Sequence, residues 1–172
     1  MDLNHITLPA SLIADIYKNH LIESDQPALP ATTPVNVNKK KPIQFLGKNQ
    51  KGICLLVNYK NDVYLPDNEL NFLTSILQAC KLNLGDVAII NCYQQKISFT
   101  ELTDEIHCKC MLIFGVEAES IGLNKAALFI AETINNCSII YSPSAEQLND
   151  NSAESKVLKS KLWICLKQLF SI

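Results

Sequence analysis

The sequence contains no arginine, and all fifteen of its basic residues are lysines. Arginine offers a planar fork of donors that matches phosphate and guanine, whereas lysine acts as a point charge. Charged residues make up 19% of the chain, and the formal net charge is −2. These features argue against a broad basic face, so we expect direct nucleic-acid binding to be weak or absent.

Long apolar runs are missing as well. A transmembrane helix needs about 18 consecutive apolar residues, and no run approaches that length. A secretory signal is also not recognisable. The cysteines number seven, and most lie inside apolar runs such as Ile53–Leu55 and Ile164–Leu166. We therefore expect no membrane span and a cytoplasmic protein with reduced, buried thiols.

The N-terminal part of the chain divides into a helix and a linker. Residues 1–23 are predicted to contain an amphipathic helix, whose apolar face includes Leu12, Ile16 and Leu21. Residues 24–42 are rich in proline and contain a lysine run, which predicts a flexible linker. Because a short isolated helix is marginally stable, its apolar face is expected to dock, either on the chain's own domain or on a partner protein.

Residues 43–172 alternate apolar runs with amphipathic segments, which predicts one folded domain. Apolar runs predict strands over 43–46, Ile53–Val57, Asp86–Asn91, Cys110–Phe114 and Cys137–Tyr141. Helical spacing predicts helices that follow an N-cap at Asp67 and that cover Ser98–Ile106 and Ser152–Phe170. The segment 126–134 fits a strand or a loop, and Trp163 and Phe170 are expected to pack on the sheet. This alternation predicts a three-layer α/β/α fold with a mostly parallel central sheet.

The end of the chain carries a motif that resembles a known superfamily. The sequence Tyr141-Ser142-Pro143-Ser144, with Leu148 after it and a final helix rich in Lys and Leu, resembles the last motif of the uracil-DNA glycosylase superfamily, especially family 4. Similar elements precede it in the same order, at Ile53–Val57 with the helix after it, Leu82–Asn91 and Met111–Ala118. The resemblance covers residues from about 50 to 170 and implies a uracil-DNA glycosylase-like fold.

The chain departs from that superfamily where its chemistry lies. Ser142 stands in the place of the catalytic histidine, and a serine hydroxyl cannot become cationic. The family's water-placing loop contains Gly and Pro, whereas the segment 58–62 here reads Asn-Tyr-Lys-Asn-Asp. The cysteine pattern of the family 4 iron–sulfur cluster is also absent. The resemblance therefore implies a pseudoenzyme without a cofactor.

Four residues stand as candidates for a remnant base pocket: Asn58, Asn91, Ser142 and Ser144. In the family, the residue matching Asn91 reads the Watson–Crick edge of a flipped base. The alternative is a strand-end asparagine that bonds the backbone of a turn. Ser142 and Ser144 either line the pocket or form the turn and helix cap that follow a strand.

A separate cluster combines His107 with Cys108 and Cys110, which suggests either a metal site or a Cys-His nucleophile. Consecutive residues on a strand point to opposite faces, and zinc requires further ligands that the sequence does not place nearby. We therefore expect no metal here, and we find no Ser-His-Asp set or phosphate-binding glycine loop.

These observations favour a non-catalytic protein that acts through protein contacts. Within the superfamily, the psi subunits of the bacterial DNA polymerase III clamp loader are similar in plan, with an N-terminal docking peptide before a degenerate domain. The resemblance thus implies a DNA replication or repair accessory subunit, whose partners are clamp-loader subunits or single-strand-binding protein. The alternative is a DNA glycosylase or nucleobase-binding protein in which Asn91 reads a base and Ser142 and Asn58 replace the lost groups.

Overall fold

The computed structural model describes residues 41–124 and 127–172. The predicted N-terminal helix, nearly all of the predicted linker and the docking candidates Leu12, Ile16 and Leu21 lie outside the described residues. Residues Lys41–Ile172 form one compact unit. Within the described ranges, no helix is long and apolar enough to cross a membrane.

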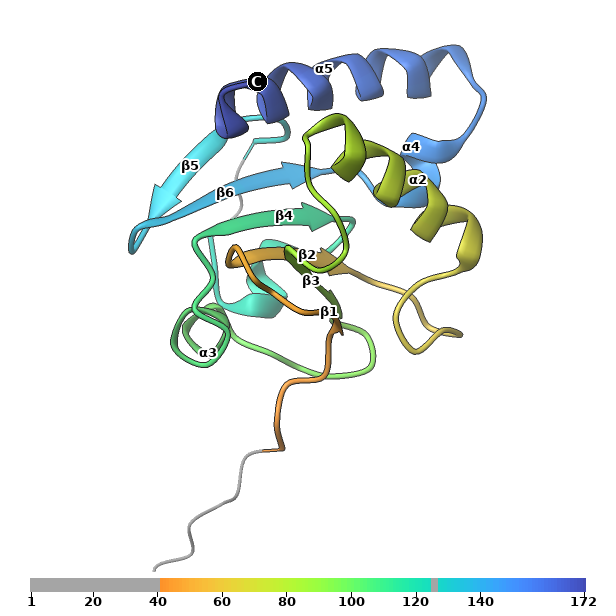
Figure 1. Ribbon diagram of the computed structural model, residues 1–172. Coiled ribbons are helices and arrows are strands. Elements are labelled where there is room, and N and C mark those ends of the chain that lie inside the picture. Colours follow the sequence, from red (N-terminus) through yellow and green to blue (C-terminus); the bar gives the residue numbers. More distant parts are fainter. Residues whose placement is uncertain (1–40, 125–126) are drawn as a thin grey trace, which may run out of the picture. The chain divides into compact units, whose positions relative to one another are not determined.

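The central sheet of the described part has the strand order β1-β3-β2-β4-β6-β5 (Figure 1). The strands are β1 Leu46–Gly47, β2 Ile53–Val57, β3 Val87–Asn91, β4 Cys110–Phe114, β5 Ala131–Ile134 and β6 Cys137–Ser142. The inner pairings are parallel, whereas the outer pairings of β1 with β3 and of β5 with β6 are antiparallel. The predicted α/β class is confirmed, and the sheet is mixed.

Helices cover both faces of this sheet. Helices α2 (Asp67–Ala79), α4 (Ala145–Asn149) and α5 (Ala153–Phe170) lie on one face, and α3 (Phe99–Asp104) lies on the other (Figure 1). The 3-10 helix η2 (Ala118–Ile121) contributes Ala118 and Ile121 to the core on the α3 face. Because side chains alternate along a strand, Leu55 of β2 enters the α2/α5 core and Leu56 enters the α3 core.

The central strands follow directly from the apolar runs. All residues of β2, β3 and β4 are buried, as expected for strands covered by helices on both faces. The segment 126–134 contains the edge strand β5, whose first three residues are exposed, and Leu128 forms an isolated bridge with Tyr141. The first strand is β1, Leu46–Gly47, which begins at the last residue of the predicted strand over 43–46.

The helix predictions are confirmed in part. Ser98 caps α3 through a capping box with Glu101, and Ser152 caps α5 by accepting from the Ser155 N–H. The predicted N-cap Asp67 is wrong, because the N-cap of α2 is Pro66 and makes no side-chain cap hydrogen bond. Asp67 instead lies in the first turn, where a carboxylate interacts favourably with the helix dipole.

The packing predicted for Trp163 is also wrong. Its side chain is 36% exposed and lines a groove between α2 and α5. The stripe of α5 that faces the core includes Leu162 and Leu166, and Trp163 lies one residue to the side of it. Phe170 packs against the same core as expected.

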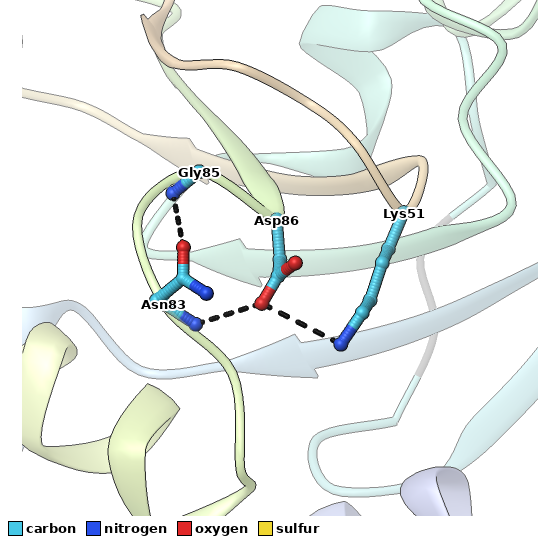
Figure 2. Close-up of polar contacts among 4 residues, drawn as sticks. All are labelled: Lys51, Asn83, Gly85 and Asp86. Atoms are coloured by element: carbon cyan, nitrogen blue, oxygen red, sulfur yellow. Dashed lines mark hydrogen bonds and ion pairs between the residues drawn. The ribbon is translucent and has the colours of Figure 1, made fainter.

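A polar turn fixes the amino end of β3. The buried Asp86 carboxylate accepts a hydrogen bond from the Asn83 N–H at 2.9 Å and lies 3.5 Å from the Lys51 ammonium (Figure 2). The Asn83 side chain accepts from the Gly85 N–H at 2.7 Å. The turn thereby joins the segment after α2 to the turn between β1 and β2.

Replacing Asp86 with alanine is expected to lower the free energy of unfolding by about 2 kcal/mol, because the Asn83 N–H loses its charged acceptor in a partly buried turn. Lys51→Ala should cost less than about 1 kcal/mol, since the pair's stabilisation is screened by water and the lysine side chain is 52% exposed. Urea denaturation measures both, with Lys48→Ala as a control in the same turn between β1 and β2. Equal losses for Asp86→Ala and Lys51→Ala would assign the stabilisation to the ion pair instead.

Candidate functional site

The candidate site lies at the carboxyl ends of the parallel strands. The chain leaves β2 through α2 to reach β3 and returns through α3, on the other face, to reach β4. In open α/β sheets such a reversal opens a crevice at the carboxyl ends of the strands, where ligands bind. Asn58 follows β2, Asn91 ends β3, and Ser142 ends β6 beside Phe114 of β4. The topology therefore brings the predicted pocket residues to one edge of the sheet.

These residues do not share one pocket. Asn91 and Ser142 lie on strands separated by β2 and β4, which corresponds to roughly 14 Å at the usual strand spacing. Asn91 and Ser142 therefore occupy two separate places along the same edge of the sheet.

The Asn91 side chain is committed to the backbone around it. It is 1% exposed, and its oxygen accepts from the Tyr59 N–H at 3.0 Å and the Tyr93 N–H at 3.2 Å. Its nitrogen donates to the Tyr59 carbonyl at 2.7 Å and to the Asp62 carbonyl at 2.9 Å. An amide group offers two donors and two lone pairs, so all of its hydrogen-bonding capacity is in use. The contacts are those of the turn-bonding alternative for this residue.

The loop after β2 is held over Asn91 by further contacts. Gln94 donates to the carbonyls of Lys60 and Asp62 at 3.0 and 3.1 Å, while Asn58 itself is exposed. Half-buried Tyr59 packs against the α2/α5 core. Burial, together with the nearby Glu69 and Glu146 carboxylates, raises the pKa of Tyr59 to about 12, so its hydroxyl is neutral at physiological pH.

The two serines of the motif have different surroundings. Ser144 caps α4, and its hydroxyl accepts from the Gln147 N–H at 3.2 Å, as in the cap alternative. Ser142 is 4% exposed, and its hydroxyl has no hydrogen-bond partner among the described residues. Its carbonyl accepts from the Gly115 N–H at 3.1 Å, which ties the turn after β6 to the turn after β4.

A cavity of about 450 Å³ lies beside Ser142 and Tyr141 at this end of β6, with the segment Val116–Glu119 and Leu128 as its other walls. The Tyr141 pKa is raised by burial and by the Glu132 and Glu119 carboxylates, which keeps its hydroxyl protonated. Among the described lining residues the charged groups are the carboxylates of Glu117 and Glu119. The lining therefore disfavours an anionic ligand such as a nucleic-acid phosphate.

The cluster predicted at His107, Cys108 and Cys110 is divided in the structure, because His107 is exposed whereas the two cysteines are buried in the core. The Cys137 thiol donates to the Cys108 sulfur at 3.8 Å, and the Cys108 thiol donates to the Cys110 carbonyl at 3.1 Å. Burial raises the pKa of Cys110 to about 12, which keeps that thiol protonated and unreactive. Across the described residues, no three His, Cys, Asp or Glu side chains are grouped so that they could hold a metal ion.

Sequence reasoning missed the residues that close this edge. Nothing in the sequence pattern links Gln94 to Lys60, because the two meet only after β2 and β3 pair. The cavity beside Tyr141 was equally hidden, since it depends on the turns after β4 and β6 meeting. Comparison of the chain with protein-family models and with curated proteins found no match.

Proposed function

We propose that this chain is a non-catalytic protein with a uracil-DNA glycosylase-like fold that acts through protein contacts, as an accessory subunit in DNA replication or repair similar to the psi subunits. The observation that carries the proposal is the state of Asn91. Its amide, which would read a base in an active relative, is 1% exposed and fully bonded to the backbone of Tyr59, Asp62 and Tyr93.

The serine side of the edge supports the same proposal. Glycosylases need a group that stabilises negative charge on the leaving base, and Ser142 supplies a neutral, buried hydroxyl at the histidine position. The carboxylates of Glu117 and Glu119 at the neighbouring cavity disfavour a phosphate backbone. A base could reach the Asn91 amide only by displacing the loop that Asn91 and Gln94 hold.

The second candidate is a nucleobase-binding protein or glycosylase with altered residues. One observation favours it: the buried Ser142 hydroxyl, without a partner among the described residues, lies beside a cavity of about 450 Å³. A nucleobase placed there would meet the Ser142 and Tyr141 side chains on one wall and the Glu117 and Glu119 carboxylates on another.

Affinity purification from native cells tests the proposal. The full chain is compared with a chain that lacks residues 1–42, and bound proteins are identified by mass spectrometry. We expect clamp-loader subunits or single-strand-binding protein to be enriched with the full chain. Loss of this enrichment on truncation would assign the contact to the N-terminal segment. A result without any replication or repair protein would contradict the proposal.

A base-release assay separates the two candidates. The purified chain is incubated with single- and double-stranded DNA that contains uracil, hypoxanthine or xanthine, and we expect no release above the rate without protein. Release that Ser142→Ala abolishes would support the second candidate, provided that circular dichroism shows the variant to be folded.

A further inference from the structure

Helix α5 has an unusual distribution of charge. It carries Lys156, Lys159, Lys161 and Lys167 but one acidic residue, Glu154. Lys167 lies in the last turn, where a cation interacts favourably with the helix dipole. Lys159 and Lys161 lie in the middle of the helix, beyond the reach of that effect, so the dipole does not account for them.

The same helix forms one wall of an apolar groove. The groove has a volume of about 190 Å³ and is lined by Phe72 and Ile76 of α2 and by Lys159, Leu162, Trp163 and Leu166 of α5. Figure 1 shows α2 and α5 on the same face of the sheet. The Lys159 ammonium lies 5.4 Å from the centre of the Phe72 ring. This distance is within the range of a cation–π contact, so the lysine head group is held at the groove.

Trp163 lies between positive charges at the edge of this groove. Lys159 precedes it by one helical turn and Lys167 follows it by one turn, and residues at this spacing are neighbours on a helix surface. The Trp163 side chain is 36% exposed. Tryptophan is one of the residue types enriched among those that dominate protein–protein binding energy.

We infer that the α2/α5 groove binds an acidic segment of a partner protein that inserts an apolar side chain beside Trp163, an inference that rests on the proposed role in protein contacts. The apolar lining accepts the anchor, and the lysines on either side of Trp163 pair with carboxylates that flank it. Glu69, Glu146 and Asp150 line a separate cavity, and the Lys159 ammonium lies 3.5 Å from the Asp150 carbonyl oxygen.

A nucleic-acid strand is a weaker match for this surface. Lysines beside a tryptophan can also hold a stacked base, but the floor of this groove consists of the aliphatic side chains Ile76, Leu162 and Leu166. The chain contains no arginine, and its net charge is −2. The four lysines of α5 can neutralise only a few phosphates, which limits the affinity for a nucleic-acid backbone.

The test uses a random sixteen-residue peptide library displayed on phage and selected against the full-length protein. We expect enriched peptides to carry a net negative charge around an aromatic or large aliphatic residue. A synthetic copy of the most enriched peptide is then titrated into the protein. Because Trp163 is the single tryptophan of the chain, its emission should shift to shorter wavelength as the anchor excludes water.

Variants locate the binding. Trp163→Ala and Lys159→Glu should each raise the Kd, measured by anisotropy of a labelled peptide, at least about tenfold. The matched controls Ile164→Ala, an exposed neighbour outside the groove, and Lys96→Glu, the same charge change before α3, should stay within about twofold. Enrichment of neutral or basic peptides, or a Kd that Trp163→Ala leaves unchanged, would overturn the inference. Tighter binding of a sixteen-nucleotide thymidine strand, with quenching of Trp163, would overturn it in favour of nucleic acid.

The outcomes also separate this inference from the proposed function. Acidic peptides that bind the groove, combined with an affinity purification that enriches no replication or repair protein, would leave the groove assignment standing and remove the proposed cellular role. If clamp-loader subunits are enriched and the variants Trp163→Ala and Lys159→Glu do not change that enrichment, the proposed cellular role would stand and the groove assignment would be removed.

Discussion

Replacing Asn91 with alanine is expected to lower the free energy of unfolding by about 3–5 kcal/mol. The substitution leaves the Tyr59 and Tyr93 N–H groups and the Tyr59 and Asp62 carbonyls without the partners they have in the native protein. Unsatisfied buried polar groups each cost about 1–3 kcal/mol, and partial access of water to the loop reduces the sum. Urea denaturation followed by circular dichroism measures the loss.

The matched control is Asn58→Ala, at an exposed position on the same edge of the sheet. It should change the free energy of unfolding by no more than about 0.5 kcal/mol. If Asn91→Ala were as mild as Asn58→Ala, the amide would not hold the loop, and it would be free to contact a ligand. The stability measurement therefore has to precede any activity measurement on Asn91→Ala, because a partly unfolded variant loses every function.

The central strands were predictable because a strand buried on both faces has a continuous apolar run in its sequence. A strand that helices cover on both faces needs apolar side chains at every position, and the runs at Ile53–Val57 and Cys110–Phe114 meet that condition. Edge strands have a less distinct sequence pattern. The strand β5 exposes its first three residues, and β1 has two residues, so their pairing depends on the neighbouring strand instead of their own composition.

The sequence predicted where the candidate site lies, but it did not predict whether the site's side chains are free to contact a ligand. Parallel strands place their carboxyl ends together, which brought Asn58, Asn91 and Ser142 to one edge. Whether the Asn91 amide is free depends on the path of the loop 58–62, and a loop path is set by contacts between distant residues such as Gln94 and Lys60. Trp163 illustrates the same limit, since a shift of one residue around a helix separates a core position from a groove position.

Replacing Gly47 with alanine is expected to lower the free energy of unfolding by about 4 kcal/mol. Gly47 has a φ of +115°, and a Cβ atom there would lie 2.2 Å from the Val87 carbonyl oxygen and 2.5 Å from the Leu84 carbonyl oxygen. Both oxygens belong to the backbone, so neither can move aside as a flexible side chain would. The strand β1 would have to separate from β3, where Gly47 pairs with Ala88.

Gly122→Ala provides the matched control for this prediction. Gly122 also has a positive φ, +78°, but a Cβ atom there would meet nothing within 4 Å. It should therefore cost only the backbone strain, about 1–2 kcal/mol, and the difference between the two variants in urea denaturation isolates the clash. Equal losses would mean that β1 yields at little cost, and the segment that leads from the N-terminal region into the sheet would then be weakly held. A large difference would show that β1 is held firmly against β3, because the clash at Gly47 could then be relieved only by breaking that pairing.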